Sequence, residues 1–315
     1  MQFDHVFAAI AEPQEPVQPV LDRATRLAAA ARANVVLFHA VFSSALTARP
    51  LLDTNRLARA RGAVVAQRTR ELEQHARALR ERGIEANTHV VWEEPAYESI
   101  IRAAIRENAD VVFAGPHARG RSNAPFSLRQ TDWQLLRLCP RPLWLVRVAR
   151  ASQGPILVAL DPTHLNDKPA SLDAALLDAA SSLGERLGVE VHAVHCVPDS
   201  MHPLDSSRSA REAALEKARK RLQKNVRKYR VQSSHVHVLS GLPEQRIPEL
   251  ARELDAQLIV MGAISRRGVK RFVIGDTAER LIDAAPCDLL IIKPAKFKLV
   301  LGRSRRERVI LPQND

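Results

Sequence analysis

The sequence is poor in the features that usually identify a secreted, disulfide-bonded or membrane protein. It has only three cysteines, Cys139, Cys196 and Cys287, an odd number that lacks the paired spacing of disulfide frameworks and zinc sites. No apolar stretch is long enough to cross a membrane, and the first residues lack the charged-then-apolar pattern of a signal peptide. These absences predict a cytoplasmic protein whose cysteines are reduced and buried.

The sequence also lacks a recognisable catalytic arrangement. No Ser-His-Asp triad and no pair of catalytic carboxylates can be assembled from it. Enzymes that use adenine nucleotides on an α/β fold often carry an SGGxDS-like loop after the first strand or an HxGH pair, and DPTHLND at Asp161 is neither. We therefore expect a protein that is not an enzyme. An adenine-nucleotide-dependent ATPase or nucleotidyl transferase is the alternative.

What the sequence does contain is an internal repeat of about half its length. The segments DHVFAAI, ANVVLFHAV, THVVWEEPAYESIIRAAIRENADVVFAGPH and TDWQLLRLCPRPLWLVR are followed, in the same order, by GPILVAL, VEVHAVHCV, VHVLSGLPEQRIPELARELDAQLIVMGAI and TAERLIDAAPCDLLIIKP. The repeat predicts two domains, 1–150 and 151–296, followed by a basic C-terminal tail, 297–315. Because the linker at 149–154 is short, we expect the two domains to pack together, through their last strands.

Each half has five short apolar runs separated by helical patterns, which is typical of a mostly parallel sheet with helices on both faces. The fold class predicted is therefore α/β, with two tandem doubly wound parallel-sheet domains of five strands each. The strands are expected at 6–10, 35–39, 88–91, 111–114 and 143–148, and again at 156–160, 189–194, 236–239, 258–261 and 289–292.

One βαβ-type unit near the end of the chain combines glycines with a helix start. The apolar run 258–261 is followed by Gly262, a basic loop, Gly275 and a helical pattern that begins DTAE, with Asp276 as the expected cap and Glu279 three positions on. Pro286 ends this helix before the last strand. Such a unit points backbone N–H groups at whatever lies beside the helix start.

These residues resemble the nucleotide motif of the universal stress protein family. That motif is a glycine, two residues, a second glycine, nine residues, and a third glycine followed by serine or threonine. The four places are filled here by Gly262, Ser265, Gly275 and Asp276, so two of the four match. The stretches TDWQLLRLCPRPLWLV, GLPEQRIPELAREL and GDTAERLIDAAPCDLLIIKP extend the resemblance over nearly the whole chain, toward the tandem members called UspE-like. It implies strand order 3-2-1-4-5 in each half, with a ligand site between strands 1 and 4.

The resemblance implies a stress-response protein that binds ATP, another adenine nucleotide or another anionic small molecule in its second half. The candidate binding residues are Asp161, Cys196, Met261, Gly262, Ser265, Gly275, Asp276 and Thr277. Asp161 would lie near the nucleoside, the backbone at Cys196 would face the adenine, and the glycines would let main-chain N–H groups approach phosphate. The alternative is that the glycines only end a strand and permit a turn.

Asp276 stands where the family has a hydroxyl, so a carboxylate would face the phosphates. Each close pair of like charges costs on the order of 1 kcal/mol even in water. Basic neighbours in the loop, Arg266, Arg267, Lys270 and Arg271, could offset this cost.

The first half departs further from the motif. Ala11, Ala118 and Arg129 stand at the places of Asp161, Ser265 and Gly275, and of the motif glycines only Gly115 is retained. We therefore expect no nucleotide in the first half.

Basic residues are concentrated on two equivalent helical segments. Residues 208–230 hold ten Lys or Arg against two Glu, a net charge of +8, and residues 56–82 have a net charge of +5, in a chain whose total is +12. Such segments could bind nucleic acid or another polyanion. Because Tyr229 is the only aromatic residue in these segments and no nucleic-acid motif is present, a solvated helix face is the preferred interpretation.

The histidines of the second half allow a further interpretation. His235 and His237 share one face of an expected strand, whereas His192 and His195 point to opposite faces. A zinc site that uses His235, His237 and a residue of the next strand is one possibility. Ordinary exposed or locally bonded histidines are the other, and we assign no metal ligand.

Overall fold

The computed structural model describes residues 1–11, 18–42, 46, 54–115, 130–147, 152–162, 170–198, 208–229, 231–263, 275–297, 299 and 301. Most of the basic tail expected at 297–315 therefore lies outside the described residues. Within the described ranges, every helix is too short or too polar to span a bilayer.

The first half alternates strands and helices, as the periodicity predicts. Its strands are β1 (His5–Ala9), β2 (Asn34–Val41), β3 (Ala86–Trp92), β4 (Val111–Ala114) and β5 (Leu143–Leu145). Its helices are α1 (Gln18–Ala31), α2 (Thr54–Arg80), α3 (Ala96–Arg106) and α4 (Gln130–Leu138).

The second half repeats this order. Its strands are β6 (Ile156–Ala159), β7 (Val191–Val197), β8 (Val236–Ser240), β9 (Leu258–Gly262) and β10 (Asp288–Ile292). Its helices are α5 (Ala170–Leu187), α6 (Arg208–Val226), α7 (Pro243–Glu253) and α8 (Asp276–Ala284), and the 3-10 turns η3 (Arg227–Tyr229) and η4 (Ser233–His235) precede β8. The second strand of this half, predicted at 189–194, is thus observed a little later in the chain, at Val191–Val197.

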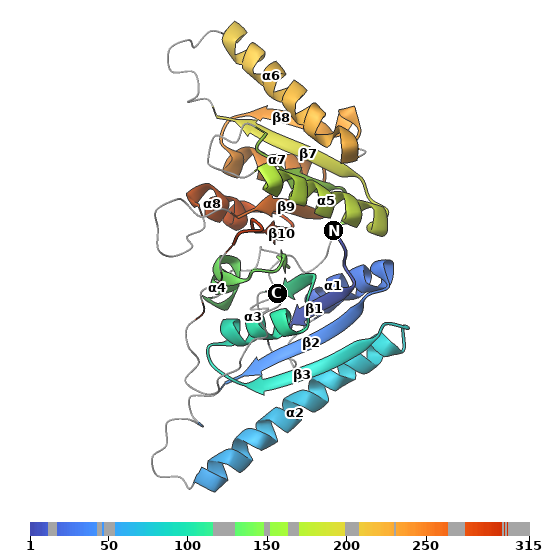
Figure 1. Ribbon diagram of the computed structural model, residues 1–315, viewed down its shortest axis with the longest axis vertical. Helices are drawn as coiled ribbons and strands as arrows, with labels where there is room; N and C mark the ends of the chain where they lie inside the picture. The colour runs from blue at the N-terminus through green and yellow to red at the C-terminus, as the bar shows by residue number, and fades with distance from the viewer. Residues whose placement is uncertain are drawn as a thin grey trace.

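All ten strands form one sheet, in the order β3-β2-β1-β4-β5-β10-β9-β6-β7-β8. Each half therefore has the predicted order 3-2-1-4-5, and the two orders meet at β5 and β10 (Figure 1). These two strands pair antiparallel, with Leu290 opposite Trp144, whereas the other neighbours pair in parallel. The expectation that the halves associate through their last strands is confirmed.

The sheet separates two apolar cores. Helices α1, α2, α5 and α6 cover one face, and α3, α4, α7 and α8 cover the other (Figure 1). Successive side chains of a strand point to opposite faces, so Val111 and Phe113 of β4 enter the first core and Val112 and Ala114 enter the second. This double burial explains why the strands are continuous apolar runs in the sequence.

A buried carboxylate joins the halves. Asp288, at the start of β10, is 1% exposed, and its Oδ2 accepts a hydrogen bond from Nε of Arg23 on α1 at 3.0 Å. Its Oδ1 accepts from the backbone N–H of Arg147 at 2.8 Å, and Nε1 of Trp144 donates to Oδ2 at 3.3 Å. All three donors belong to the first half, so one side chain of the second half satisfies three polar groups across the junction.

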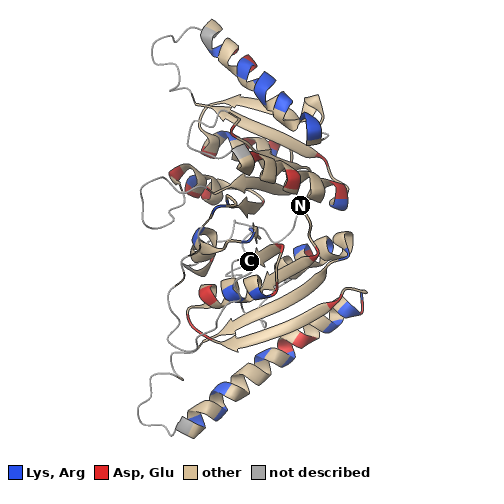
Figure 2. Cartoon of the chain, in the orientation of Figure 1, with Lys and Arg blue, Asp and Glu red and all other residues tan. Residues whose placement is uncertain are grey.

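The two basic helices lie far apart. α2 packs on β3 and α6 packs on β8, the strands at the two ends of the sheet, so the helices occupy opposite ends of the molecule (Figure 1). α6 buries Ala218, Leu222 and Val226, whereas its exposed residues include Arg211, Lys217, Arg219, Lys220, Arg221 and Lys224. Figure 2 marks the lysines and arginines along this helix. The two helices therefore do not combine into one basic surface.

Candidate functional site

Four of the predicted site residues lie at the carboxyl ends of neighbouring strands in the second half. Asp161 follows β6, Cys196 is near the end of β7, and Met261 and Gly262 end β9. Because β6 pairs in parallel with both β7 and β9, these ends meet at one edge of the sheet, where the strand order changes direction. α8 follows β9 and begins with Asp276 and Thr277. Ser265 and the basic residues of its loop lie outside the described residues.

Asp161 is positioned by helix α5. Its backbone N–H donates to Oδ1 of Asp173 at 3.4 Å, and Asp173 is a buried side chain in the first turn of α5. This contact ties the chain that leaves β6 to the helix that follows it.

The two motif glycines have different structural roles. A Cβ at Gly262 would lie 2.8 Å from Cδ2 of Leu172, so glycine at this position lets α5 pack closely on β9. At Gly275 no described atom lies within 4 Å of such a Cβ, and its φ of −65° is open to any residue. Packing within the described residues therefore explains Gly262 but not Gly275.

The start of α8 differs from the prediction that Asp276 caps it. Gly275 is the N-cap, its carbonyl oxygen accepts from the N–H of Glu279 at 3.0 Å, and Asp276 is the first residue of the helix. Because the N-cap residue is a glycine, it has no side chain that could form a capping hydrogen bond. The prediction was wrong because the DTAE pattern fits the cap position and the first helical turn equally well, and backbone geometry decides between them.

Cys196 and Met261 reach this edge through their backbones. Both side chains are buried in the core beneath α7 and α8. Burial raises the pKa of the Cys196 thiol to about 12, against a smaller opposing effect of Arg246, so the thiol is protonated at neutral pH. It is therefore not an activated nucleophile.

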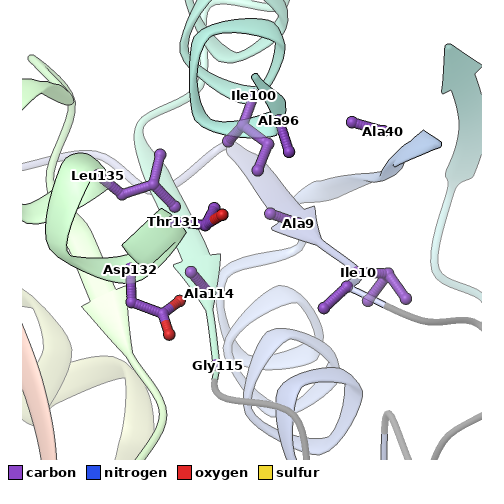
Figure 3. A pocket seen from close by; sticks show the side chains of 11 residues that line it. Ala9, Ile10, Ala40, Ala96, Ile100, Ala114, Gly115, Thr131, Asp132 and Leu135 are labelled. Atoms are coloured by element: carbon purple, nitrogen blue, oxygen red, sulfur yellow. The ribbon is translucent and has the colours of Figure 1, made fainter. Parts of the chain in front are cut away.

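The equivalent edge of the first half holds a small apolar pocket of about 80 Å³. Its lining residues are Ala9, Ile10, Ala11, Ala40, Ala96, Ile100, Ala114, Gly115, Thr131, Asp132 and Leu135. Ile100, Leu135 and Thr131 converge over the strand ends at Ala9 and Ala114 (Figure 3). Pockets for drug-sized ligands have volumes of roughly 300 Å³ or more, so this pocket does not accommodate a nucleotide as it stands.

The shared sheet and the two switch points define a tandem, doubly wound α/β protein. The sequence pattern of the Universal stress protein family matches residues 2–147 and 154–293. The chain therefore belongs to the universal stress protein family, with two tandem domains of this family.

Relatives of the same tandem type match over almost their full length. Universal stress protein E of Salmonella typhi is 30% identical over 304 residues, which cover 92% of this chain and 94% of that protein. Universal stress protein E of Escherichia coli K12 is 29% identical over the same shares. These similarities confirm the UspE-like resemblance inferred from the sequence.

Solved structures show the same fold. A functionally unknown protein from Pseudomonas aeruginosa PAO1 superposes with a TM-score of 0.71 at 23% identity, covering 93% of each chain. A universal stress protein from Archaeoglobus fulgidus DSM 4304 has a TM-score of 0.60 at 18% identity and covers 93% of this chain and 99% of its own. At these identities the matches identify the fold alone, and they confirm the predicted fold class.

Proposed function

We propose that this protein is a stress-response protein without catalytic activity whose second domain binds an adenine nucleotide at the carboxyl edge of β6 and β9. One observation carries the proposal: α8 begins at this edge after Gly275, an N-cap residue without a side chain, and the described structure leaves open space beside this glycine. The first N–H groups of a helix have no partner within it, and they favour anionic groups such as phosphate.

Only the second domain is proposed to bind the ligand. Asp161 and Gly275 are present there, whereas the first domain has Ala11 and Arg129 at the same places. The 80 Å³ pocket of the first domain is also lined mainly by alanine and other apolar groups. We propose that the first domain serves the second as its partner in the shared sheet.

Asp276 is proposed to weaken the site for polyphosphates. Its side chain is exposed in the first turn of α8. The negative charge interacts favourably with the helix dipole there, but it repels a phosphate bound to the same N–H groups. The site would then favour ligands with few negative charges, such as a nucleoside monophosphate, over ATP.

Asp276→Ser is expected to tighten ATP binding by about tenfold, equivalent to about 1 to 2 kcal/mol of removed repulsion. Isothermal titration calorimetry with ATP and AMP measures the change, and the gain should be larger for ATP. Asp178→Ser is the matched control because it removes the same charge from an exposed position of α5.

Gly275→Val tests whether the ligand lies beside α8. The backbone at this position accepts valine and the described structure leaves room for it, so the variant should fold normally and lose most of its affinity for nucleotide. Gly262→Val is less informative, because its side chain would collide with Leu172. Unchanged affinity in Gly275→Val, or no adenine-nucleotide binding by the parent protein, would contradict the proposed site.

The same samples distinguish the alternative of an enzyme. Release of phosphate or pyrophosphate from bound ATP, lost in Gly275→Val, would indicate an ATPase or a nucleotidyl transferase. We expect the bound nucleotide to be recovered intact.

A further inference from the structure

A second group of polar side chains lies at the opposite, amino edge of the sheet. Glu190 immediately precedes β7, His192 is the second residue of β7, and His235 ends the turn η4 just before β8. Nε2 of His192 lies 3.6 Å and Nε2 of His235 lies 3.8 Å from Oε2 of Glu190, and one ligand atom from each residue falls within 4.8 Å of the others. Three potential metal-ligating atoms therefore surround one point.

His192 has a buried nitrogen that its surroundings do not satisfy. The residue is 7% exposed, and its Nε2 has no hydrogen-bond partner among the described residues. Leaving a buried polar atom unpaired costs about 1–3 kcal/mol, so such atoms in native proteins call for an explanation. The unpaired nitrogen lies 3.6 Å from Oε2 of Glu190, and the ring of His192 stacks on that of His235 with centroids 4.1 Å apart.

His237 orients His192 from the other side. The two residues approach at 2.9 Å between Nδ1 of His192 and Nε2 of His237. In the tautomer in which Nδ1 of His192 carries the proton and donates to His237, Nε2 of His192 keeps its lone pair. A histidine that binds a metal through one nitrogen typically donates a hydrogen bond from the other, and this fixes both its tautomer and its ring orientation.

We propose that Glu190, His192 and His235 form a binding site for a divalent transition-metal ion, with Zn²⁺ the best-fitting ion and one coordination position left open. Two imidazoles and a carboxylate are a donor set that suits zinc and excludes calcium and magnesium as preferred ions. Tetrahedral ligands at 2.0–2.1 Å from zinc lie about 3.4 Å apart, so the observed 3.6 and 3.8 Å require only small shifts.

The side chains around the site can make those shifts. The rings of His192 and His235 are stacked within 11° of parallel, so one ring has to rotate before both Nε2 lone pairs point at one ion. His235 lies on a short turn and Glu190 is exposed, and both can move more easily than the buried His192.

The first half provides an internal comparison. Val6 pairs with Val35 as Ile156 pairs with Val191, so the places of Glu190 and His192 are held there by Asn34 and Val36. Asn87 lies opposite Val36 and takes the place of His235. Of the four residues, only His237 has a histidine counterpart, His89. The ligand set is thus specific to the second half, and the first half shows that this fold accepts other residues at these positions.

The test is a titration of the metal-stripped full chain with ZnCl₂ by isothermal titration calorimetry at pH 7.5, supported by the visible spectrum of the Co²⁺ complex. The decisive variant combines Glu190→Asn, His192→Val and His235→Asn, which are the residues of the first half. We expect one Zn²⁺ per chain in the parent protein and at least a 100-fold loss of affinity in this variant. His89→Gln is the matched control and should bind as the parent does.

Two further variants keep the proposal falsifiable if the triple variant does not fold. His235→Asn changes a side chain that is only partly buried and should lose affinity by at least tenfold. His237→Leu leaves all three ligands in place and removes the acceptor of His192, so it should weaken Zn²⁺ by roughly 10–100-fold. The proposal is overturned if the parent protein binds no Zn²⁺, or if the ligand variants bind it as tightly as the parent.

Discussion

Replacing Asp288 by alanine is expected to lower the free energy of unfolding by about 3–5 kcal/mol, because it leaves buried donors without their acceptor. Arg23 is 7% exposed, and its guanidinium would remain inside the junction without its carboxylate partner. The N–H groups of Arg147 and Trp144 would lose the same partner. Urea denaturation followed by circular dichroism and by tryptophan fluorescence measures the loss.

The chain offers a matched control for this prediction. Arg137 and Glu279 form another ion pair between the halves, at 3.4 Å, but both side chains are more than a third exposed. Exposed pairs contribute about 0–1 kcal/mol, so Glu279→Ala should have little effect. A loss in Asp288→Ala as small as that in Glu279→Ala would show that the buried network is not what holds the halves together.

A double replacement distinguishes the contribution of the ion pair to stability from the contribution of side-chain packing. Arg23→Met combined with Asp288→Leu removes both charges and keeps similar volumes, and exchanges of this kind are often neutral or stabilising. The double variant should therefore be more stable than Asp288→Ala. If it is not, the hydrogen bonds from Arg147 and Trp144 outweigh the ion pair.

Gly154→Ala is expected to destabilise the protein by roughly 2–3 kcal/mol, as overpacking against rigid backbone does. A Cβ at Gly154 would lie 2.0 Å from the carbonyl oxygen of Asp255, which is backbone and cannot rotate away. The linker is also held in place there, because the hydroxyl of Ser152 donates to the same carbonyl oxygen at 2.6 Å. Relief of the clash therefore requires the linker to leave the second domain.

Gly62→Ala is the control for this substitution. It lies within α2, and no atom outside that helix's own backbone lies within 4 Å of its added Cβ in the described structure. Alanine should stabilise this helix by about 1 kcal/mol relative to glycine. Thermal unfolding of the two variants should thus give shifts of opposite sign, and equal shifts would mean that the contact with Asp255 is not a constraint.

Much of the fold could be predicted from the sequence, because its strands are buried on both faces. Runs such as Val111–Ala114 and Leu258–Gly262 are continuous and apolar, and the helices between them have a different period. The repeat then assigned the same topology to both halves. The association of the halves through β5 and β10 was predicted from the short linker and from two apolar strands that each end a half-sheet, and the structure adds that the two strands pair antiparallel.

The sites were less predictable, because they depend on atoms brought together from distant segments. The glycine pattern selected both Gly262 and Gly275, but only the packing of Leu172 against β9 shows that the first serves α5. The sequence pattern allowed a zinc site of His235, His237 and a residue of the next strand, whereas the structure groups His235 with His192 of β7 and with Glu190, which precedes that strand.

The sequence by itself determined the fold class through its local periodicity, and its resemblance to the family implied the strand order of each half. Only the tertiary structure decided that Gly275 rather than Asp276 caps α8, that Asp288 joins the halves, and that a buried nitrogen of His192 faces Glu190. The physical reason is that the spacing of apolar residues along each helix or strand indicates which of its residues are buried. Hydrogen bonds and ligand geometry depend on distances of a few ångströms between elements, and these exist only after the sheet has formed.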